Sequence, residues 1–411
     1  MNRINEMIRE FCPNGIKTVP LWKYTAWDKK FNAVDNSMQK SIIKYKYLLA
    51  NKLNEIVDNT GDIRILYTSE EVAYTTEEKA GEFISQGEIV AIPWGGNPNV
   101  KYYNGRFITG DNRIATSIAP KILDTKFLYY VLLNKLDIIS TFYRGAGIKH
   151  PSMLSVLTLE IPLPPLNIQK EIVSILDSFT SLIDKMKQEV EMRKKQMEYY
   201  IDKFYGGDFD GMMRLADIPG NSVAQFSDLG PIIRGKRFVR DDIRTVGQPC
   251  IHYGDMYTYY GTMAVTAKTF LERDFPKKMR YAHKGDVVIV GAGENDYDIG
   301  VGLVWMGEEP AAVHDACYIL KHHQIPMYIS YYLRSNIYHQ QLKKYVSSGK
   351  ISSFSAEGLG KVYIPIQPED KQRQIVSILD TFETYISKLE KMIELRQKQY
   401  EYYREKLLTF E

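Results

Sequence analysis

The sequence predicts an α+β fold with a pseudo-twofold internal repeat, in which two similar α/β domains are separated by two long antiparallel helices forming a coiled coil. Two observations support this fold. One segment with a helical pattern of apolar residues occurs twice, and the segment preceding each copy repeats more weakly as short strand-like patterns. The 411 residues also exceed one ordinary domain core, which favours two or more domains.

The duplicated segment begins IPLPPLNIQKEIVSILD at Ile161 and IPIQPEDKQRQIVSILD at Ile364, and the copies align without a gap beyond their shared EYY block. Prolines at the start of each copy end any earlier element and allow a helix to begin. Each copy therefore predicts one helix of roughly 55 Å, at ~1.5 Å per residue. A compact domain rarely needs a helix of this length.

Apolar residues recur along both helices at alternating steps of three and four, which is the pattern of a narrow apolar stripe. Two such stripes in one chain can bury each other, so we expect an antiparallel coiled coil with a domain before each helix at opposite ends. Two separate surface helices are the alternative. The predicted helix-pair contacts are Ile172, Ile175, Phe179, Ile183, Ile375, Leu379, Phe382 and Ile386.

The weaker repeat lies in the segments before the helices. GEIVAIP from Gly87 resembles GDVVIV from Gly285, and FLYYVLLN from Phe127 resembles YISYYLRS from Tyr328. GIKHPSMLSVLTLEI from Gly147 likewise aligns with KISSFSAEGLGKVYI from Lys350. Order and spacing are kept while most side chains differ, which predicts four segments: a domain over 1–160, a helix over 161–206, a domain over 207–363 and a helix over 364–411.

Bulk properties indicate a protein of the cytoplasm. Cys12, Cys250 and Cys317 are too far apart in the sequence to indicate disulfides or a zinc site. No apolar run is long enough for a membrane span, and the N-terminus lacks the pattern of a signal peptide. The net charge of +3 says little about partners, because nucleic-acid binding depends on where the basic residues lie.

Motifs for catalysis are missing from the sequence. The nearest glycine pattern, at Gly291 and Gly293, lacks the third glycine of a cofactor loop, and no P-loop occurs. The histidines have no metal-ligand spacing with a cysteine or a carboxylate pair. We therefore expect no catalytic residue, no metal and no cofactor in this chain.

The two junctions IPLPPLNIQKEIVSILD and IPIQPEDKQRQIVSILD resemble the conserved spacer regions of type I restriction–modification specificity subunits. PNGIKTVPLWKY, IIRGKRF and GQPCIHYGDMYTYYG are similar to segments that open target-recognition domains in that family. The whole chain fits the family's layout of variable domain, helix, variable domain and similar helix.

This resemblance implies that each target-recognition domain reads one half of a bipartite, asymmetric site in double-stranded DNA, while the helices set the distance between the halves. It also implies two modification subunits, which bind S-adenosylmethionine and methylate adenine, docked on this chain. Restriction subunits, which use ATP and Mg, would join through the modification subunits. A fused methyltransferase or nuclease and a protein-only coiled-coil adaptor are the alternatives.

Residues that could contact DNA combine donors for phosphate with polar side chains that can reach base edges. For each one, a surface or turn role is the alternative. In the first domain the candidates are Trp94, Asn97, Lys101, Tyr102, Arg106, Asn112, Arg113, Arg144, Lys149 and His150. In the second domain they are Arg234, Lys236, Arg237, Arg240, His252, Tyr253, Tyr257, Tyr259, Tyr260, Asn295, Lys350, Ser352 and Ser353.

Overall fold

The computed structural model describes residues 2–275, 278–293, 299–347, 349 and 351–410, with only the backbone of Asn2 and Tyr257. The chain divides into two compact units. The first unit contains Met1–Lys185 and Met392–Glu411, and the second contains Met186–Lys391. Each unit therefore includes part of both long helices, whereas the sequence prediction set the helices apart as separate segments.

The first unit is built around a six-stranded sheet of order β2-β7-β5-β6-β3-β4. Its strands are β2 (Thr25–Trp27), β3 (Ile63–Leu66), β4 (Val72–Thr75), β5 (Ser85–Pro93), β6 (Lys101–Thr109) and β7 (Asn112–Ser117). All neighbours are antiparallel except β3 and β6. Two short antiparallel pairs accompany the sheet: β1 (Thr18–Pro20) with β10 (Glu160–Pro162), and β8 (Tyr143–Arg144) with β9 (His150–Pro151). The α-helices of this unit, apart from the two long ones, are α1 (Asn2–Phe11), α2 (Ala50–Glu55), α3 (Glu77–Ala80), α4 (Thr125–Asn134), α5 (Leu136–Thr141) and α6 (Met153–Leu157).

The second unit contains two larger sheets, of order β12-β21-β17-β19-β14 and β15-β13-β20-β16. Their strands are β12 (Ile232–Arg234), β13 (Gln248–Ile251), β14 (Met263–Ala264), β15 (Thr269–Leu271), β16 (Tyr281–Ala282), β17 (Val287–Val290), β19 (Gly302–Trp305), β20 (Ala311–Val313) and β21 (Cys317–Leu320). Strand β11 (Ser222–Gln225) pairs with β23 (Tyr363–Ile366), and β18 (Ala292–Gly293) with β22 (Ser352–Ser353). The α-helices here are α8 (Phe209–Leu215), α9 (Phe226–Leu229), α10 (Tyr253–Thr258), α11 (Pro326–Tyr332), α12 (Asn336–Leu342) and α13 (Ala356–Gly360).

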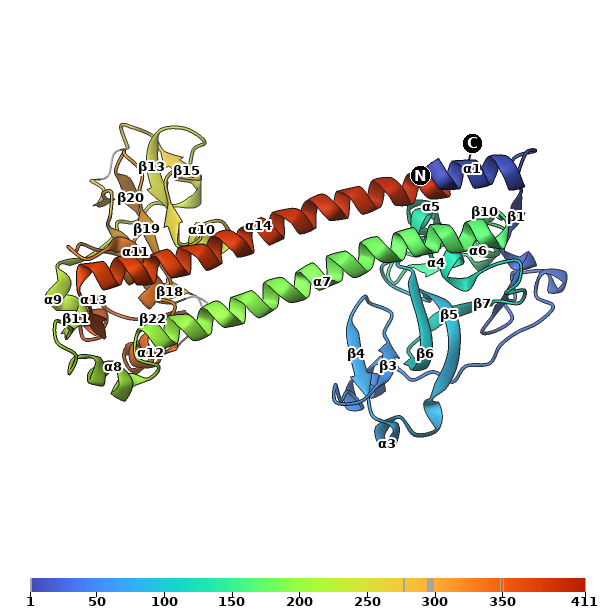
Figure 1. Ribbon diagram of the computed structural model, residues 1–411, viewed down its shortest axis with the longest axis horizontal. Coiled ribbons are helices and arrows are strands. Elements are labelled where there is room, and N and C mark those ends of the chain that lie inside the picture. The colour runs from blue at the N-terminus through green and yellow to red at the C-terminus, as the bar shows by residue number, and fades with distance from the viewer. Residues whose placement is uncertain (1, 276–277, 294–298, 348, 350, 411) are drawn as a thin grey trace. The chain divides into compact units, whose positions relative to one another are not determined.

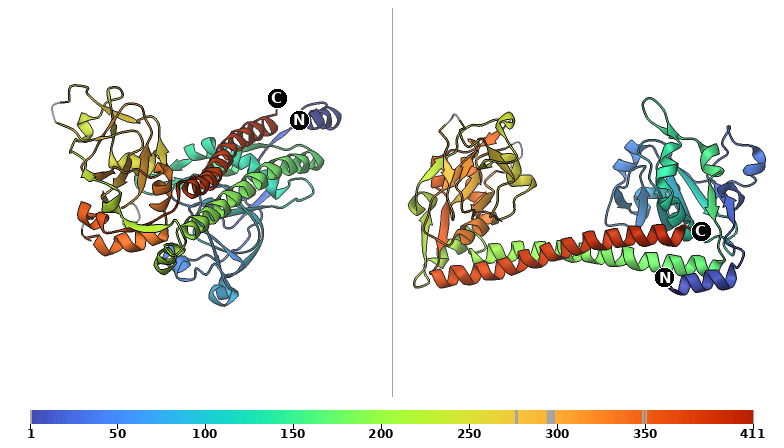
Figure 2. Two further views of the ribbon diagram at one scale, coloured as in Figure 1. Left: turned by 60° about the vertical axis from the view of Figure 1, so that its left-hand side comes forward. Right: turned by 90° about the horizontal axis from the view of Figure 1, so that it is seen from above.

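The two long helices are α7 (Leu166–Phe204) and α14 (Glu369–Leu408), and they run antiparallel (Figure 1, Figure 2). Both begin a few residues later than their sequence repeat, because Ile161 and Ile364 belong to strands β10 and β23. Five 3-10 turns complete the described structure: η1 (Leu21–Lys23), η2 (Asn36–Met38), η3 (Gly81–Phe83), η4 (Arg240–Asp242) and η5 (Lys343–Tyr345).

The antiparallel coiled coil predicted from the sequence is confirmed by the same ring contact in each unit. In the first unit Phe179 stacks on Tyr403 with ring centroids 5.4 Å apart, and in the second Phe382 meets Tyr200 at 5.6 Å. Phe179 is the repeat equivalent of Phe382, and Tyr200 of Tyr403. Both copies of the repeat have therefore kept this aromatic contact. Of the predicted helix-pair contacts, Ile172, Ile183, Ile375, Leu379 and Ile386 are buried, and Ile175, Phe179 and Phe382 are half-buried.

A buried glutamine fixes each long helix to its own unit. The Gln169 amide donates to the carbonyl oxygens of Ile122 and Pro164, both at 2.7 Å, and its oxygen accepts the Asp124 N–H. Its repeat equivalent, Gln372, donates to the Gln367 carbonyl at 2.8 Å and accepts the Ile325 N–H. Because buried amides need such partners, these bonds fix how each helix begins against its domain.

An aspartate in the first third of each long helix forms a second matching contact. The Tyr130 hydroxyl of α4 donates to Asp177 at 2.6 Å, and the Tyr331 hydroxyl of α11 donates to Asp380 at 2.7 Å. Asp177 and Asp380 both end the shared IVSILD block.

The described part of the chain has no helix that is long and apolar enough to cross a membrane.

Candidate nucleic-acid interface

In the first unit, Trp94 is the centre of a cluster at the end of β5. Its ring lies 5.2 Å from the ring of His150, 5.0 Å from the Arg113 guanidinium carbon and 5.6 Å from Lys29 Nζ. His150 Nδ1 donates to the Trp94 carbonyl oxygen at 2.7 Å, which leaves Nε2 as the acceptor of the neutral ring. The structure thus brings together three candidates from distant parts of the sequence.

Two candidates of this unit are corrected by their burial. Asn112 is 3% exposed, and its amide donates to the carbonyl oxygens of Leu66 and Tyr67. Arg113 is 2% exposed, and its guanidinium forms ion pairs with Asp28, at 2.9 Å, and with Asp111. Both side chains hold the sheet together, and neither reaches a surface where it could contact DNA directly.

Lys101, Tyr102 and Arg106 lie along β6 and are already engaged within the protein. Lys101 Nζ donates to the Thr68 carbonyl oxygen at 3.3 Å and to Asn99. The Tyr102 hydroxyl donates to Glu88 at 2.8 Å, and Arg106 pairs with Glu77 at 2.5 Å. A phosphate would have to compete with these partners for each donor.

Burial lowers the pKa of Lys101 to about 8. Because the unfolded side chain titrates near ~10.4, the folded state binds fewer protons between these two pH values. We therefore expect wild type to be less stable than a Lys101→Met variant below pH 8, and this difference to shrink as the pH rises toward 10. Urea unfolding of both proteins across this range measures it, and a difference that does not vary with pH would contradict the lowered pKa.

The exposed candidates of the first unit are Asn97, Arg144, Lys149 and His150. The last three belong to the hairpin that β8 and β9 form, where Arg144 pairs with His150 across the two strands. The Gly96 N–H donates to the Lys149 carbonyl oxygen at 3.2 Å, which joins this hairpin to the loop after Trp94. The exposed candidates of the first unit therefore lie on two adjoining segments.

In the second unit, the exposed basic candidates Arg234, Lys236, Arg237 and Arg240 lie at the end of β12 and on the segment after it. Arg234 Nε donates to the Asp315 carbonyl oxygen at 2.8 Å, and the Lys236 N–H donates to that of Val313. The basic segment therefore lies along the end of β20. Side chains spaced in this way can position a phosphate backbone.

Beside this segment lies a ring cluster that the sequence indicated only in part. His252 and Tyr253 follow β13, and His314 follows its parallel neighbour β20. The ring centroid of His314 lies 4.8 Å from that of His252 and 5.3 Å from that of Tyr253. His314 was missing from the predicted contacts, because nothing in the sequence shows that the two strands are neighbours.

Both histidines are held in the neutral form. Burial lowers the pKa of His314 to about 4 and also lowers the pKa of His252. Nδ1 of His314 accepts the Ala316 N–H at 3.1 Å, and Nδ1 of His252 accepts the Gly254 N–H at 3.2 Å. Each neutral ring therefore carries its proton on Nε2. The His314 ring already hydrogen-bonds the Phe238 backbone, whereas Nε2 of His252 can donate to an acceptor on a base edge.

The remaining candidates of the second unit differ in exposure. Tyr259 is exposed beside Lys268, whereas Tyr260 packs on the core and accepts the Lys268 N–H at 2.8 Å. Ser352 is buried in β22 and is corrected as a direct contact, while Ser353 is half-buried. The side chain of Tyr257, and Asn295 and Lys350 as a whole, lie outside the described residues.

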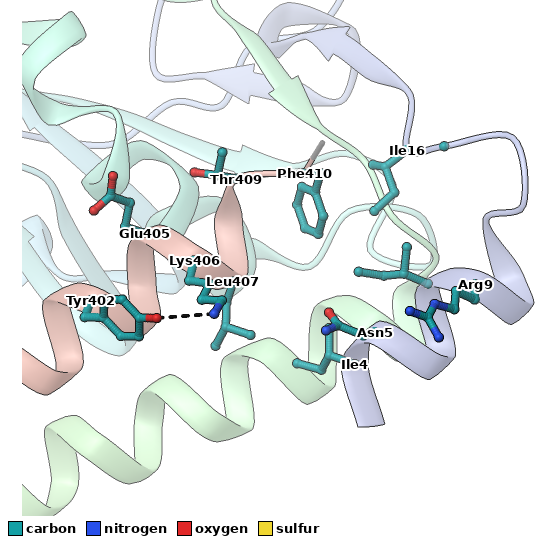
Figure 3. Close-up of a pocket in the computed structure, with 12 residues that line it drawn as sticks. Ile4, Asn5, Arg9, Ile16, Tyr402, Glu405, Lys406, Leu407, Thr409 and Phe410 are labelled. Carbon is teal, nitrogen blue, oxygen red and sulfur yellow. Dashed lines mark hydrogen bonds between the residues drawn. The ribbon is translucent and has the colours of Figure 1, made fainter. Parts of the chain in front are cut away.

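A cavity of about 600 Å³ in the first unit lies apart from these candidates. Residues of α1, such as Ile4 and Arg9, face the end of α14 across it, where Lys406 donates to the Tyr402 hydroxyl at 3.2 Å (Figure 3). None of the predicted DNA contacts lines this cavity. Across the described residues, no group of three or more His, Cys, Asp or Glu side chains is placed to hold a metal ion.

Comparison with known proteins assigns the chain to a family. The model of the type I restriction modification DNA specificity domain matches residues 30–192 and again residues 220–397. The chain belongs to this family. The two matches extend into α7 and α14 respectively, so the specificity subunit carries two copies of the family's domain.

Individual relatives agree with this assignment. The specificity subunit is 29% identical over 357 residues to a Haemophilus influenzae protein described as a type I restriction enzyme specificity subunit, covering 80% of this chain and 84% of the relative. Its fold resembles that of the type I system S subunit of M. genitalium, with a TM-score of 0.57, 16% identity and 96% of each chain covered. A chain from a structure on complex assembly and conformational transition of the type I system matches with a TM-score of 0.54 and 15% identity, over 96% of this chain and 98% of the other.

Proposed function

We propose that this specificity subunit is a non-catalytic DNA reader, in which the target-recognition domain of each unit contacts one half of a bipartite, asymmetric site. The observation that carries this proposal is that the two units share equivalent buried contacts, whereas their exposed residues differ. Gln169 and Gln372 make equivalent bonds, whereas the hairpin positions Arg144 and His150 correspond to Ser347 and Ser353. Two target-recognition domains with the same internal structure and different surface residues suit two different half-sites.

The long helices support the partner part of the proposal. Besides the stripe that each buries, each exposes apolar residues at repeat-equivalent positions. Met192 and Leu395 are 57% and 58% exposed, and Leu182 and Tyr199 correspond to Tyr385 and Tyr402, which are also exposed. Apolar residues at helical spacing on an outer face indicate contact with another protein. Two equivalent faces suit two modification subunits.

The chemistry would belong to these partners. We propose that the modification subunits bind S-adenosylmethionine and methylate adenine, and that restriction subunits using ATP and Mg join through them. The helices would then set the distance between the two half-sites, as the separation of two readers does in dimeric DNA-binding proteins.

Methylome sequencing tests the proposal. The chain is expressed in a methylation-free host with and without its modification subunit, and then with each target-recognition domain exchanged in turn. We expect a bipartite adenine-methylation motif that needs both proteins and changes in one half with each exchange. The absence of any motif with an active, matched modification subunit would favour the protein-only adaptor, and methylation without that subunit would favour a fused methyltransferase.

A further inference from the structure

Each unit contains a hairpin closed at the same repeat-equivalent positions. Residues 144–150 form the first, closed by the antiparallel pair of Arg144 and His150. In the second, Ser347 and Ser353 form the closing bridge: the Ser347 N–H donates to the Ser353 carbonyl oxygen at 2.8 Å and the Ser353 N–H donates back at 3.1 Å. Residues 348 and 350, between them, lie outside the described residues. The gap-free alignment that pairs Ile161 with Ile364 also pairs these closing residues. The hairpin is therefore part of the duplicated frame.

Isoleucine is the one residue that the two hairpin sequences share. Ile148 and Ile351 occupy the same position, whereas the other six positions differ between RGAGIKH and SSGKISS. Ile148 is 70% exposed and Ile351 is 60% exposed, so neither is kept for packing in a core. A single exposed apolar side chain is ordinary on a protein surface, but the same exposed isoleucine at the same position of both hairpins singles out this pair of residues.

Both hairpins contact a glycine-containing segment that follows a central strand. In the first unit, Ile148 Cγ2 lies 2.8 Å from where a side chain on Gly95 would begin, so a larger residue there would displace the isoleucine side chain. In the second, Ser352 and Ser353 of β22 pair with β18, just after β17, and the Phe354 N–H donates to the Gly291 carbonyl oxygen at 3.2 Å (β18 and β22, Figure 1). The residues beside each isoleucine are therefore held against the segment after a central strand.

The surroundings of the isoleucines favour DNA over protein as the partner. The first hairpin carries Arg144, Lys149 and His150, the sequence of the second carries Lys350, and neither sequence contains an acidic residue. The exposed apolar residue that follows the first hairpin in the sequence, Leu154, corresponds to Glu357 in the repeat, so this apolar neighbour is not shared. An apolar side chain on a small, cationic loop suits a wedge between base pairs.

We propose that Ile148 and Ile351 are wedges that enter the minor groove and partly unstack one base step in each half-site. This inference rests on the proposed function, because it concerns how the two units hold their DNA. Unstacking would bend the duplex toward the major groove and make each half-site sensitive to the stiffness of bases that no side chain contacts. Such a step would also lower the cost of extruding a neighbouring base for methylation.

The test uses the full chain assembled with its modification subunits, on duplexes that carry the site found by methylome sequencing. Ile148→Ala and Ile351→Ala are compared with Ile148→Leu and with Ile118→Ala and Val246→Ala, which truncate exposed residues outside the hairpins. Energy transfer between labelled duplex ends reports bending, and titration reports affinity. In a second set of duplexes, each duplex carries one mismatch, and its position moves stepwise through each half-site across the set. The mismatch weakens the stacking of one base step before the protein binds.

We expect each hairpin alanine variant to lose affinity for the intact duplex by about tenfold and to reduce bending. One mismatch position in the matching half-site should restore its affinity, while the leucine variant and both controls stay near wild type. Unchanged bending and affinity, or an equal loss on every duplex, would overturn the wedge. So would loss of modification subunits from the DNA-free complex, which would make the isoleucines protein anchors. If wild type itself fails to bind its site, the proposed function fails instead.

Discussion

Replacing Arg113 with methionine should lower the free energy of unfolding of the first unit by about 3–5 kcal/mol at pH 7, because it leaves a buried carboxylate without its partner. Arg113 is enclosed between Asp28 and the Trp94 ring, and the Asp28 carboxylate also accepts the Ile114 N–H at 3.0 Å. Burial raises the pKa of Asp28 even with Arg113 beside it. Removing the guanidinium therefore raises that pKa further.

The pH dependence of the variant follows from this shift. A carboxyl whose folded pKa lies above its unfolded value binds more protons in the folded state, so its contribution to stability increases as the pH falls. We expect Arg113→Met to recover part of its lost stability between pH 7 and pH 5. Hydrogen exchange of first-unit peptides, followed by mass spectrometry in urea, measures the loss in this unit alone.

A double variant separates the ion pair from packing. Asp28→Leu combined with Arg113→Met removes both charges, and replacement of a buried pair by apolar residues is often close to neutral. The double variant should therefore be more stable than Arg113→Met alone. A single variant that loses less than about 1 kcal/mol would show that Arg113 does not hold the sheet.

The repeat, the long helices and their antiparallel pairing could be predicted from the sequence, because the apolar stripe is a local pattern that the duplication shows twice. The exact buried face was less accurate. Leu176 is fully buried while the predicted contact Ile175 is only half-buried. An α-helix has ~3.6 residues per turn, so a stripe assigned with alternating steps of three and four, which average ~3.5, drifts around the helix along its length.

The candidate site was predicted less well, because residues that are distant in the sequence become neighbours only through the pairing of strands. Arg113 reads as an exposed basic residue after a turn, and its partner Asp28 lies far away in the sequence on the chain leaving β2. His314 joins His252 only because β20 and β13 are parallel neighbours. Gln169 and Gln372 gave a signal that could have been used: an identical polar residue at the start of two duplicated apolar stripes suggests a buried partner.

A single glutamate on the outer face of either long helix should remove one modification subunit from the complex. Met192→Glu and Leu395→Glu place the same charge at repeat-equivalent, exposed positions, so neither helix pairing nor a domain core should suffer. Burying an unpaired carboxylate under a partner costs more than ~1.4 kcal/mol, so the affinity of that face should fall at least about tenfold.

Native mass spectrometry counts the subunits. We expect two modification subunits on wild type, one on each single variant and none on the double variant, whose host DNA should lose methylation. Met192→Leu and Leu395→Met keep an apolar side chain at the same exposed positions and serve as matched controls. If the double variant keeps both subunits, the modification subunits dock elsewhere, and the exposed apolar faces of α7 and α14 have another partner.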